Sequence, residues 1–401
     1  MRILVVNNFV RQGSGIDASV AIEMRVLAER GHDLWLLRRD NADLDRVSAA
    51  GRGALLASSL YSLSSRAEVD RLLRRERVDV VHLHNLVPFV TGAVYDACRR
   101  RAVPTVQHLR NYRAFCLSSY AYRDGRGCDD CWPTAFVSCA LHRCYRDSRL
   151  ASAGLVAARW IDWARGRRSG YGADRYIANS AFTKARHVEH GLAPEAVQVL
   201  HNAAEDLGAL RDETDRRLDE LPTRPALTFV GSLIRAKGPW LALDLAGALP
   251  EFSVSFVGSG DDEPALRRAA HSRRLDNVTF HGVLAGQAKA AVWAGSFLTV
   301  VPSLWDEPFG NVVPESYSLA VPVLAAPNGG LVETVVDAAT GLTLDVSRVD
   351  DAAARVRALW ADRERSNAMR AAARAEYDRR FTERAFADRL EALLLDATGH
   401  P

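Results

Sequence analysis

Residues 301–333, VPSLWDEPFGNVVPESYSLAVPVLAAPNGGLVE, contain two strand-to-helix crossings in succession and decide the fold. The apolar, β-branched run over 296–301 predicts a buried parallel strand. Residues 312–320 predict a helix with Pro314 in its first turn, where a missing N–H costs nothing. A second strand over 321–326 leads into a turn with paired glycines and a helix over 331–336. Strands that alternate with helices in this way predict an open parallel sheet.

Two carboxylates bracket the first crossing. Glu307 and Glu315 are separated by residues 308–314, and Phe309, Gly310 and Asn311 form the crossing itself. In an open α/β sheet, ligands bind at the carboxyl ends of the strands, and the free N–H groups of the following helix attract phosphate. Carboxylates accept strong hydrogen bonds from hydroxyls, so a ligand with an anionic half and a hydroxyl-rich half, such as a nucleotide sugar, suits both. Either carboxylate taken alone could simply complement the helix dipole.

The pattern PSxWxEPFGxVxxE, followed by xPVxAxxxGGxxE, resembles the retaining family-four glycosyltransferases of the GT-B fold. Weaker matches from residue 1 to about residue 205 and from residue 226 onward extend the resemblance to nearly the whole chain. The resemblance implies an α/β protein with two Rossmann-like, doubly wound domains that face a central cleft. It also implies that Glu307 holds hydroxyls of a donor sugar, that Glu315 holds the ribose, and that catalysis needs no metal or other cofactor.

The length of 401 residues exceeds one ordinary core, so we expect two domains of about 200 residues each. The first covers 1–203 with a cysteine-rich insertion over 111–147, and the second covers 204–380, whereas the charged segment 202–225 reads as a linker. By resemblance, a C-terminal segment over 381–401 forms a helix that crosses back to the first domain. The expected strands are 2–7, 33–37, 78–83, 104–108, 174–178, 197–200, 226–230, 252–257, 278–281, 297–301 and 321–325.

The composition is that of a globular protein, with 48% hydrophobic residues, 25% charged residues and a net charge of +3. This small charge gives no indication of a nucleic-acid partner. No apolar run reaches the length of a membrane span and the chain opens directly on a strand, so we expect a cytoplasmic protein. The helix expected over 148–168 combines a basic face with two tryptophans. It either makes a peripheral membrane contact or packs its apolar side onto the sheet, and helical period does not distinguish the two.

Five of the six cysteines lie in the insertion, around a central C-x-x-C, a spacing that lets two thiolates share a tetrahedral metal. Cys98 lies apart from them on a helix and reads as a buried thiol. A subset of the resembled glycosyltransferases carries a similar insertion, and in this chain Cys139 is extra and His142 is a spare nitrogen ligand. By that resemblance, the ligands of a structural zinc ion are Cys116, Cys128, Cys131 and Cys144.

The loop after the first strand contains Gly13 and Gly15 in a G-x-G-x-x-A pattern, with Asp40 after the second strand. A dinucleotide-binding fingerprint requires its first glycine at the turn that leaves strand one, whereas residues 8–12 intervene here. In the resembled family such a loop lies over the donor phosphates, which assigns Gly13 and Gly15 to donor binding. The glycines could also merely permit a turn.

Two positions depart from the resembled pattern. In VGSLIRAKG, residues 230–238, Lys237 matches a diphosphate-binding lysine, but Ser232 stands where an arginine is usual, and Arg235 could substitute for it. In QHLRNY, residues 107–112, Arg110 stands where the family has a histidine, and His108 precedes it by two positions. Side chains two apart on a strand share a face, so we expect both in the cleft, where an arginine would restore the positive charge lost at Ser232. The alternative is a surface Arg110 and a core His108.

The residues and the resemblance together predict a retaining hexosyl-type glycosyltransferase. It would move a sugar from a nucleotide-diphosphate donor to a hydroxyl acceptor that is a saccharide, a lipid-linked molecule or a small molecule. The departures at Ser232 and Arg110 keep open a second interpretation, a catalytically weak GT-B subunit that binds nucleotide sugar or scaffolds a partner. A third interpretation is a dehydrogenase, and only the glycine loop favours it. The expected catalytic residues are His108, Arg110, Glu307 and Lys237. The expected donor-binding residues are Gly13, Gly15, Ser232, Arg235, Lys237, Glu307, Phe309, Gly310, Asn311 and Glu315.

Overall fold

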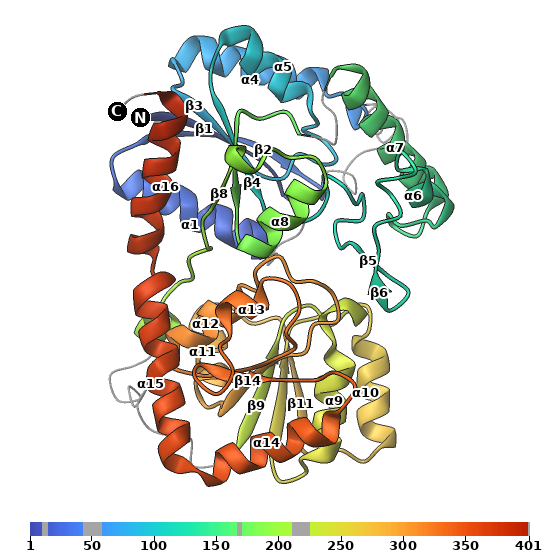
Figure 1. Cartoon of the computed structure of the whole chain (residues 1–401), viewed down its shortest axis with the longest axis vertical. Coiled ribbons are helices and arrows are strands. Elements are labelled where there is room, and N and C mark those ends of the chain that lie inside the picture. The colour runs from blue at the N-terminus through green and yellow to red at the C-terminus, as the bar shows by residue number, and fades with distance from the viewer. Residues whose placement is uncertain (10–14, 43–57, 167–170, 211–224, 400–401) are drawn as a thin grey trace. The chain divides into compact units, whose positions relative to one another are not determined.

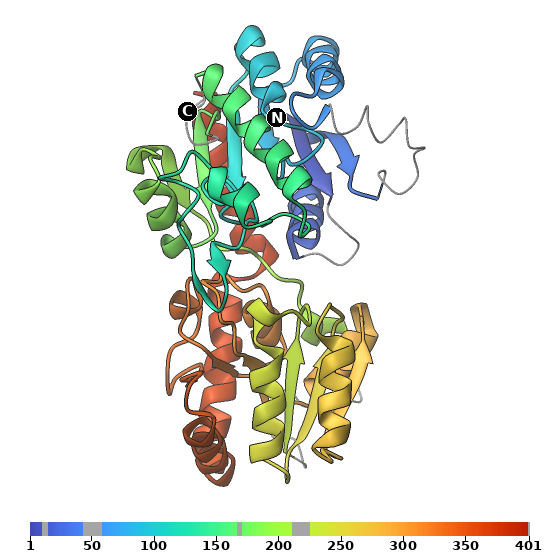
Figure 2. The same ribbon diagram turned by 90° about the vertical axis from the view of Figure 1, so that its right-hand side faces the viewer.

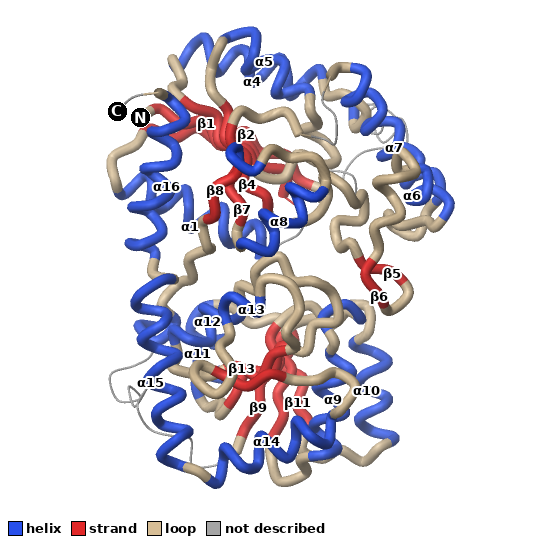
Figure 3. The backbone as a smooth tube through the Cα atoms, viewed as in Figure 1, coloured by secondary structure: helices blue, strands red, loops and turns tan. Residues whose placement is uncertain are grey.

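The computed structural model divides the chain into two compact units (Figure 1). Unit 1 comprises Met1–Ala121, Cys128–Asn202 and Glu383–Pro401, and unit 2 comprises Tyr122–Gly127 and Ala203–Thr382. Each unit is built on a six-stranded sheet with helices around it (Figure 3), which confirms the predicted α/β class with two doubly wound halves. The structure describes residues 1–9, 15–42, 58–166, 171–210 and 225–399.

The sheet of unit 1 has the order β2-β1-β3-β4-β7-β8, and every neighbouring pair is parallel. Its central strands are buried along their length because helices cover both faces, as their runs of valine, leucine and isoleucine predict. The strand bounds are β1 (Arg2–Phe9), β2 (Asp33–Asp40), β3 (Val80–Leu83), β4 (Thr105–Leu109), β7 (Arg175–Ala178) and β8 (Val197–Val199).

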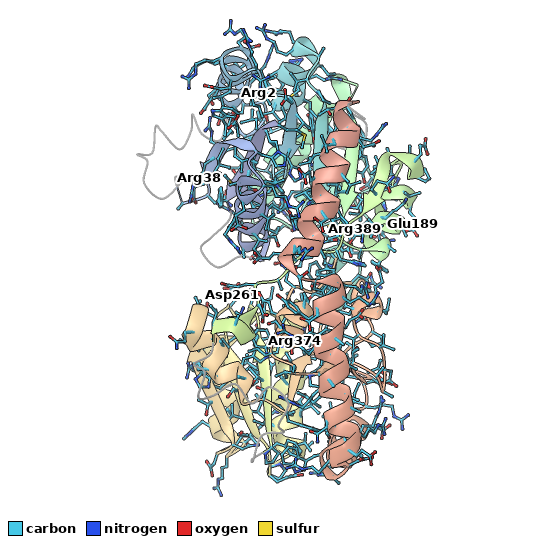
Figure 4. All side chains as sticks on the ribbon, turned by 90° about the vertical axis from the view of Figure 1, so that its left-hand side faces the viewer. Arg2, Arg38, Glu189, Asp261, Arg374 and Arg389 are labelled. Carbon is cyan, nitrogen blue, oxygen red and sulfur yellow. The ribbon has the colours of Figure 1, made fainter. Side chains whose placement is uncertain are left out.

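Helices α1 (Gly15–Glu29) and α16 (Glu383–Thr398) pack side by side in unit 1 (Figure 1), although they lie at opposite ends of the sequence. Leu390 and Leu394 of α16 are fully buried. Arg389, labelled in Figure 4, donates a hydrogen bond to the Val199 carbonyl at 3.0 Å. The other long helices of unit 1 are α4 (Leu63–Glu76), α5 (Ala93–Arg101), α7 (Arg149–Ala164) and α8 (Ala181–Glu189).

The cysteine-rich insertion contains the short helix α6 (Val137–Leu141), which packs against α7 (Figure 2). Val156 of α7 is buried in the cluster that the insertion forms, so it packs on the insertion and not, as the packing alternative had it, on the sheet. Leu150 and Trp160, by contrast, are exposed by 82% and 48%. The insertion also holds an antiparallel hairpin of β5 (Tyr122–Arg123) and β6 (Arg126–Gly127), which groups with unit 2. The hairpin was not predicted, because two-residue strands carry no alternation.

The sheet of unit 2 has the order β11-β10-β9-β12-β13-β14 and is again parallel throughout. Its strands are β9 (Ala226–Val230), β10 (Ser253–Val257), β11 (Val278–Gly282), β12 (Leu298–Val301), β13 (Val323–Ala325) and β14 (Gly341–Thr343). Its helices are α9 (Pro239–Ala248), α10 (Glu263–Ser272), α11 (Gly286–Ala294), α12 (Val312–Ser318), α13 (Leu331–Thr334), α14 (Val349–Ala361) and α15 (Arg363–Arg380).

The expected linker is packed over its first part, so this prediction was wrong there. The Ala204 N–H donates to the Phe381 carbonyl at 3.1 Å, and Leu207 is buried in a cluster with Trp293. Arg374, labelled in Figure 4, donates from both terminal nitrogens to the carboxylate of Asp206 at 2.9 Å each. Residues 203–210 therefore pack within unit 2, and residues 211–224 lie outside the described part of the chain.

Candidate functional site

Three loops of unit 2 follow the carboxyl ends of the adjacent strands β9, β12 and β13 and are tied to one another. The Leu304 N–H donates to the Ala236 carbonyl at 2.8 Å, which joins the β12 loop to the β9 loop. Asn328 donates from its side chain to the Ser303 carbonyl at 2.7 Å, which joins the β13 loop to the β12 loop. The loops therefore form one surface at the sheet edge where ligands of such folds bind.

Glu307 lies at the centre of these loops and is only 3% exposed. Its Oε1 atom accepts hydrogen bonds from Lys237 Nζ at 2.5 Å, Ser303 Oγ at 2.7 Å and Trp305 Nε1 at 2.9 Å. The ammonium group of Lys237 also lies 5.2 Å from the centre of the Trp305 ring. A buried carboxylate needs such partners, and they hold Glu307 in one orientation.

The paired glycines after β13, Gly329 and Gly330, lie against the backbone of the β12 loop. A Cβ on Gly329, whose φ is +65°, would lie 2.2 Å from the Glu307 carbonyl oxygen. A Cβ on Gly330 would lie 2.6 Å from the Pro308 carbonyl oxygen, and the Gly330 N–H donates to the Glu307 carbonyl at 2.6 Å. The glycines let the β13 loop approach the β12 loop closely, and this contact fixes the backbone of Glu307.

The remaining predicted residues of unit 2 occupy varied positions. Glu315 lies in the first turn of α12, and its Oε2 accepts from Lys289 Nζ on α11 at 2.7 Å. Phe309 is buried in a hydrophobic cluster, so its side chain supports the loop and only its backbone can face a ligand. The predicted residues that remain are the exposed Ser232 and Arg235 and the half-buried Gly310 and Asn311.

In unit 1, His108 and Arg110 are both buried and lie together, which rules out a surface position for Arg110. The Arg110 guanidinium donates to Glu23, lies 3.2 Å from His108 Nδ1 and donates to Asn202 Oδ1 at 2.8 Å. The positive charge of Arg110 is thus offset by Glu23 within the unit. Gly15 opens α1 in the same unit, and Gly13 lies outside the described residues.

Two further histidines, His82 and His84, join Glu23 at the carboxyl end of β3. Glu23 Oε2 lies 3.4 Å from His84 Nε2 and 3.7 Å from His82 Nδ1, and Glu23 Oε1 lies 3.3 Å from His108 Nδ1. Burial lowers the pKa of His108 to about 3 and those of His82 and His84 well below their usual value. These four residues could hold a metal ion, and the Arg110 guanidinium already brings positive charge to them.

Four cysteine thiols approach one another in the insertion. Cys131 lies within hydrogen-bonding reach of Cys116 and Cys139, and Cys139 reaches Cys144. The contact with Cys131 and burial raise the pKa of the Cys116 thiol well above its ordinary value. Three of the four predicted zinc ligands, Cys116, Cys131 and Cys144, are therefore connected through thiol contacts that also include Cys139. The fourth, Cys128, is half-buried and lies three positions before Cys131.

A pocket in unit 1 opens beside His108 and Arg110. The segment after β3 and the helix α7 contribute apolar wall residues such as Leu86, Val87 and Leu155. The segment after β4 contributes Arg113, and α7 also contributes Arg159. The wall is therefore apolar on one part and cationic on another.

Two family models match the two halves of the chain. "Glycosyltransferase Family 4" matches residues 13–206, and "Glycosyl transferases group 1" matches residues 211–376. The chain belongs to the GT-B glycosyltransferases of family 4 and group 1. This assignment agrees with the motif around Glu307 and with the two parallel sheets.

Curated relatives in this glycosyltransferase family match about half of the chain. A D-inositol 3-phosphate glycosyltransferase of Mycobacteroides abscessus is 33% identical over 204 residues, which are 47% of this chain and 43% of the relative. A GDP-mannose-dependent α-(1-6)-phosphatidylinositol monomannoside mannosyltransferase of Mycobacterium tuberculosis is 31% identical over 227 residues, 52% of this chain and 58% of the relative. The chain thus spans about half the length of these relatives.

Solved structures match the chain over its whole length. Anabaena HepE in complex with UDP-glucose has a TM-score of 0.69 at 19% identity and covers 99% of this chain and 100% of its own. Sucrose-phosphate synthase from Thermosynechococcus elongatus has a TM-score of 0.71 at 17% identity and covers 99% of each chain. These likenesses establish the GT-B fold.

Among the described residues, no helix combines the length and the hydropathy of a membrane span.

Several residues of the site were not predicted, although some left a signal. Ser303 and Trp305 precede Glu307 by four and two positions, the spacing that puts side chains of an extended segment on one side. His82 and His84 show the same spacing after a buried run. Lys289 left none, because it is paired with Glu315 only through the packing of α11 on its neighbours.

Proposed function

We propose that this glycosyltransferase family member transfers a hexose from a nucleotide-diphosphate sugar to a hydroxyl acceptor with retention of the anomeric configuration. The observation that carries the proposal is the ion pair of the buried Glu307 with the partly exposed Lys237, within the three connected loops of unit 2. Glu307 would accept hydrogen bonds from the donor sugar, and Lys237 would stabilise the charge that develops on the leaving diphosphate. Glu315, positioned by Lys289, would accept hydrogen bonds from the ribose.

The proposed transfer also involves backbone amides of unit 2 and side chains of unit 1. The amides of the β12 and β13 loops and the start of α12 would supply further donors to the diphosphate. Carboxylates would hold the hydroxyls of the donor, and amides together with Lys237 would stabilise the diphosphate, so the proposal includes no catalytic metal. In unit 1, His108 and Arg110 line the pocket in which an acceptor hydroxyl would sit. Because Arg110 is already paired with Glu23, its role would be to position groups of the pocket rather than to offer a free charge.

The test is a nucleotide-release assay over a panel of sugar nucleotides. The M. tuberculosis relative is named as GDP-mannose-dependent and a HepE structure holds UDP-glucose, so the panel starts with UDP- and GDP-linked hexoses. Release above background with one donor supports the proposal. Proton NMR of the product then reports whether the anomeric configuration is retained.

A matched pair of variants assigns the activity to the site. Lys237→Ala should lower turnover about a hundredfold, the scale of one lost donor to developing charge. Arg268→Ala removes an exposed cation of α10 in the same unit and should leave turnover unchanged. Equal turnover in both variants would count against the role of Lys237.

A catalytically weak nucleotide-sugar-binding subunit is the second candidate, because the charge of Arg110 is offset by Glu23 and a neutral serine occupies position 232. Calorimetry separates the two. Tight binding of a sugar nucleotide with no release from folded protein would favour the subunit.

A further inference from the structure

The pocket of unit 1 contains two arginines that the proposed transfer does not use. Arg113 follows β4, and Arg159 lies on α7 and is only 8% exposed. Arg159 Nη2 donates to the backbone carbonyl of Arg113 at 3.2 Å, so the two residues are held next to each other. Both arginines line the same pocket, so one ligand could contact both of them.

The charges of these arginines are poorly balanced by the protein. Arg113 Nη1 donates to the Leu117 carbonyl at 2.9 Å, and no carboxylate of the described residues lies within ion-pair distance of it. Arg159 Nη1 lies 3.8 Å from Asp162 Oδ2, which is a loose contact. The Nε atoms of both arginines are buried without a hydrogen-bond partner in the described part of the chain.

Neutral partners cannot replace a counter-charge. The two guanidiniums lie 5.9 Å and 5.5 Å from the ring centres of Tyr145 and Phe136, and these rings stabilise a cation only modestly. Burial lowers the pKa of Arg113, whereas Tyr145 and Cys116 oppose this shift and Arg159 adds to it. A buried cation without an anion is costly, so an anion that enters the pocket would relieve the cost.

The other ionisable groups of the pocket do not supply that anion. Burial lowers the pKa of His108 and of His187 to about 3, so both rings are neutral near pH 7. Arg110 is offset by Glu23. Asp162 is therefore the acidic residue in the described lining, and neither arginine has a carboxylate within hydrogen-bond distance.

We propose that Arg113 and Arg159 form a phosphate-binding subsite, and that the acceptor of the transfer carries a phosphate or diphosphate group. Arginine suits this role because its planar fork binds phosphate oxygens through two parallel hydrogen bonds. The apolar wall at Leu86, Val87 and Leu155 would receive the less polar part of such a molecule. That the bound molecule is the acceptor rests on the proposed transfer, whereas phosphate binding by the two arginines does not.

The experiment is a calorimetric titration of the full chain with inorganic pyrophosphate. All proteins carry Lys237→Ala, which weakens diphosphate binding at the donor site of unit 2. Within this background, Arg113→Gln and Arg159→Gln should each weaken pyrophosphate binding by about tenfold or more, the scale of a lost charged hydrogen bond. Arg149→Gln removes an exposed cation from the same helix as Arg159 and should bind as the background does.

Thermal denaturation checks that each variant is folded. Should Arg159→Gln unfold, Arg159→Lys keeps the charge, loses the fork and should bind with intermediate affinity. The proposal is overturned if the Lys237→Ala protein binds no pyrophosphate, or if folded Arg113→Gln and Arg159→Gln bind it as well as Arg149→Gln does.

Two further probes identify the source of the phosphate. Glucose 1-phosphate represents a soluble sugar phosphate, and geranyl diphosphate represents a lipid-linked diphosphate. Whichever binds through Arg113 and Arg159 more tightly than pyrophosphate identifies the acceptor class. If binding depends on the two arginines but no donor gives nucleotide release, the proposed transfer is contradicted and the phosphate-binding subsite is supported. If nucleotide is released but binding does not depend on the arginines, the subsite is contradicted and the transfer is supported.

Discussion

At the scale of single residues, Glu307 concentrates most of the interactions of the candidate donor site. Three donors from three positions converge on one of its oxygens, and two of them, Ser303 and Trp305, precede it on the same loop. Such convergence restricts the side chain to one rotamer. A ligand that meets Glu307 therefore finds the carboxylate already oriented, which lowers the cost of binding.

The change Glu307→Gln tests this orientation. The amide oxygen can still accept from Ser303 and Trp305, while Lys237 loses its counter-charge and remains partly open to solvent. We expect a folded protein with a turnover lowered about a hundredfold, the scale of one lost electrostatic contact in a transition state. Nucleotide release and thermal denaturation measure the two effects, and normal turnover would show that the carboxylate is only structural.

His187 makes the stability of unit 1 depend on pH. Its ring contacts the Tyr171 hydroxyl at 2.6 Å and the Asn111 carbonyl at 3.1 Å, and burial lowers its pKa to about 3. The unfolded chain, with a pKa of about 6.5, binds the proton first, so the contribution is complete above about pH 6.5 and is lost as the pH falls toward 3. At pH 5 the loss is about 2 kcal/mol.

Urea denaturation at pH 7 and pH 5 measures this loss. The variant His187→Gln cannot titrate, so its free energy of unfolding should change less between the two pH values by about 2 kcal/mol. His271→Gln, which removes an exposed histidine from α10, should retain the pH dependence of the natural chain. An unchanged slope in His187→Gln would mean that the ring titrates normally in the folded state.

At the scale of elements, the close approach of the β12 and β13 loops depends on Gly329. Alanine there combines a strained φ of +65° with a contact of 2.2 Å to the Glu307 carbonyl. Gly282 has a φ of +70°, and a Cβ there would meet nothing within 4 Å, so Gly282→Ala shows the strain alone. Gly329→Ala should destabilise the protein by about 1–3 kcal/mol more than Gly282→Ala does. Urea denaturation decides, and equal losses would show that the loops separate freely.

The cysteine-rich insertion is the second element with a measurable expectation. We expect about one zinc ion per chain by elemental analysis, because four thiolates close a tetrahedral shell. Cys116→Ser and Cys131→Ser should lose the metal, whereas Cys98→Ala, at a buried thiol of α5 whose pKa burial raises to about 12, should keep it. Comparing Cys128→Ser with Cys139→Ser identifies the fourth ligand. Metal-free protein with freely titratable thiols would contradict the prediction.

Elements with a strong apolar pattern were predicted from the sequence to within a few residues. The strand at 226–230 was predicted with its observed bounds, and the start of α12 was recognised from Pro314 and the preceding loop. The strand β14 was missed because three residues carry no periodicity, and α4 because its buried stripe is thin within an arginine-rich helix. The pairing of Glu23 with Arg110 was missed because the two residues are 87 positions apart and meet only in the folded unit.

At the scale of the whole molecule, unit 1 depends on a helix that the chain contributes last. Leu390 of α16 is fully buried. Arg25 of α1 pairs with Glu383 of α16, and Arg30, the residue after α1, pairs with Glu391. Leu390→Ala should lower the free energy of unfolding of unit 1 by about 2–5 kcal/mol, the cost of truncating a core leucine. Arg384→Ala, at an exposed position of the same helix, should have little effect. Comparable losses in both variants would show that α16 is not part of the core.

The place of α16 also determines when unit 1 can fold during synthesis. The helix contacts α1 and the strands β3 and β4, yet its residues follow the whole of unit 2 in the sequence. A ribosome that adds about 5–20 residues per second needs roughly 10–40 seconds to travel from Asn202 to Glu383. During that interval the apolar face awaiting Leu390 and Leu394 is open to water, so the nascent first half is a natural client for chaperones while the second half completes its core.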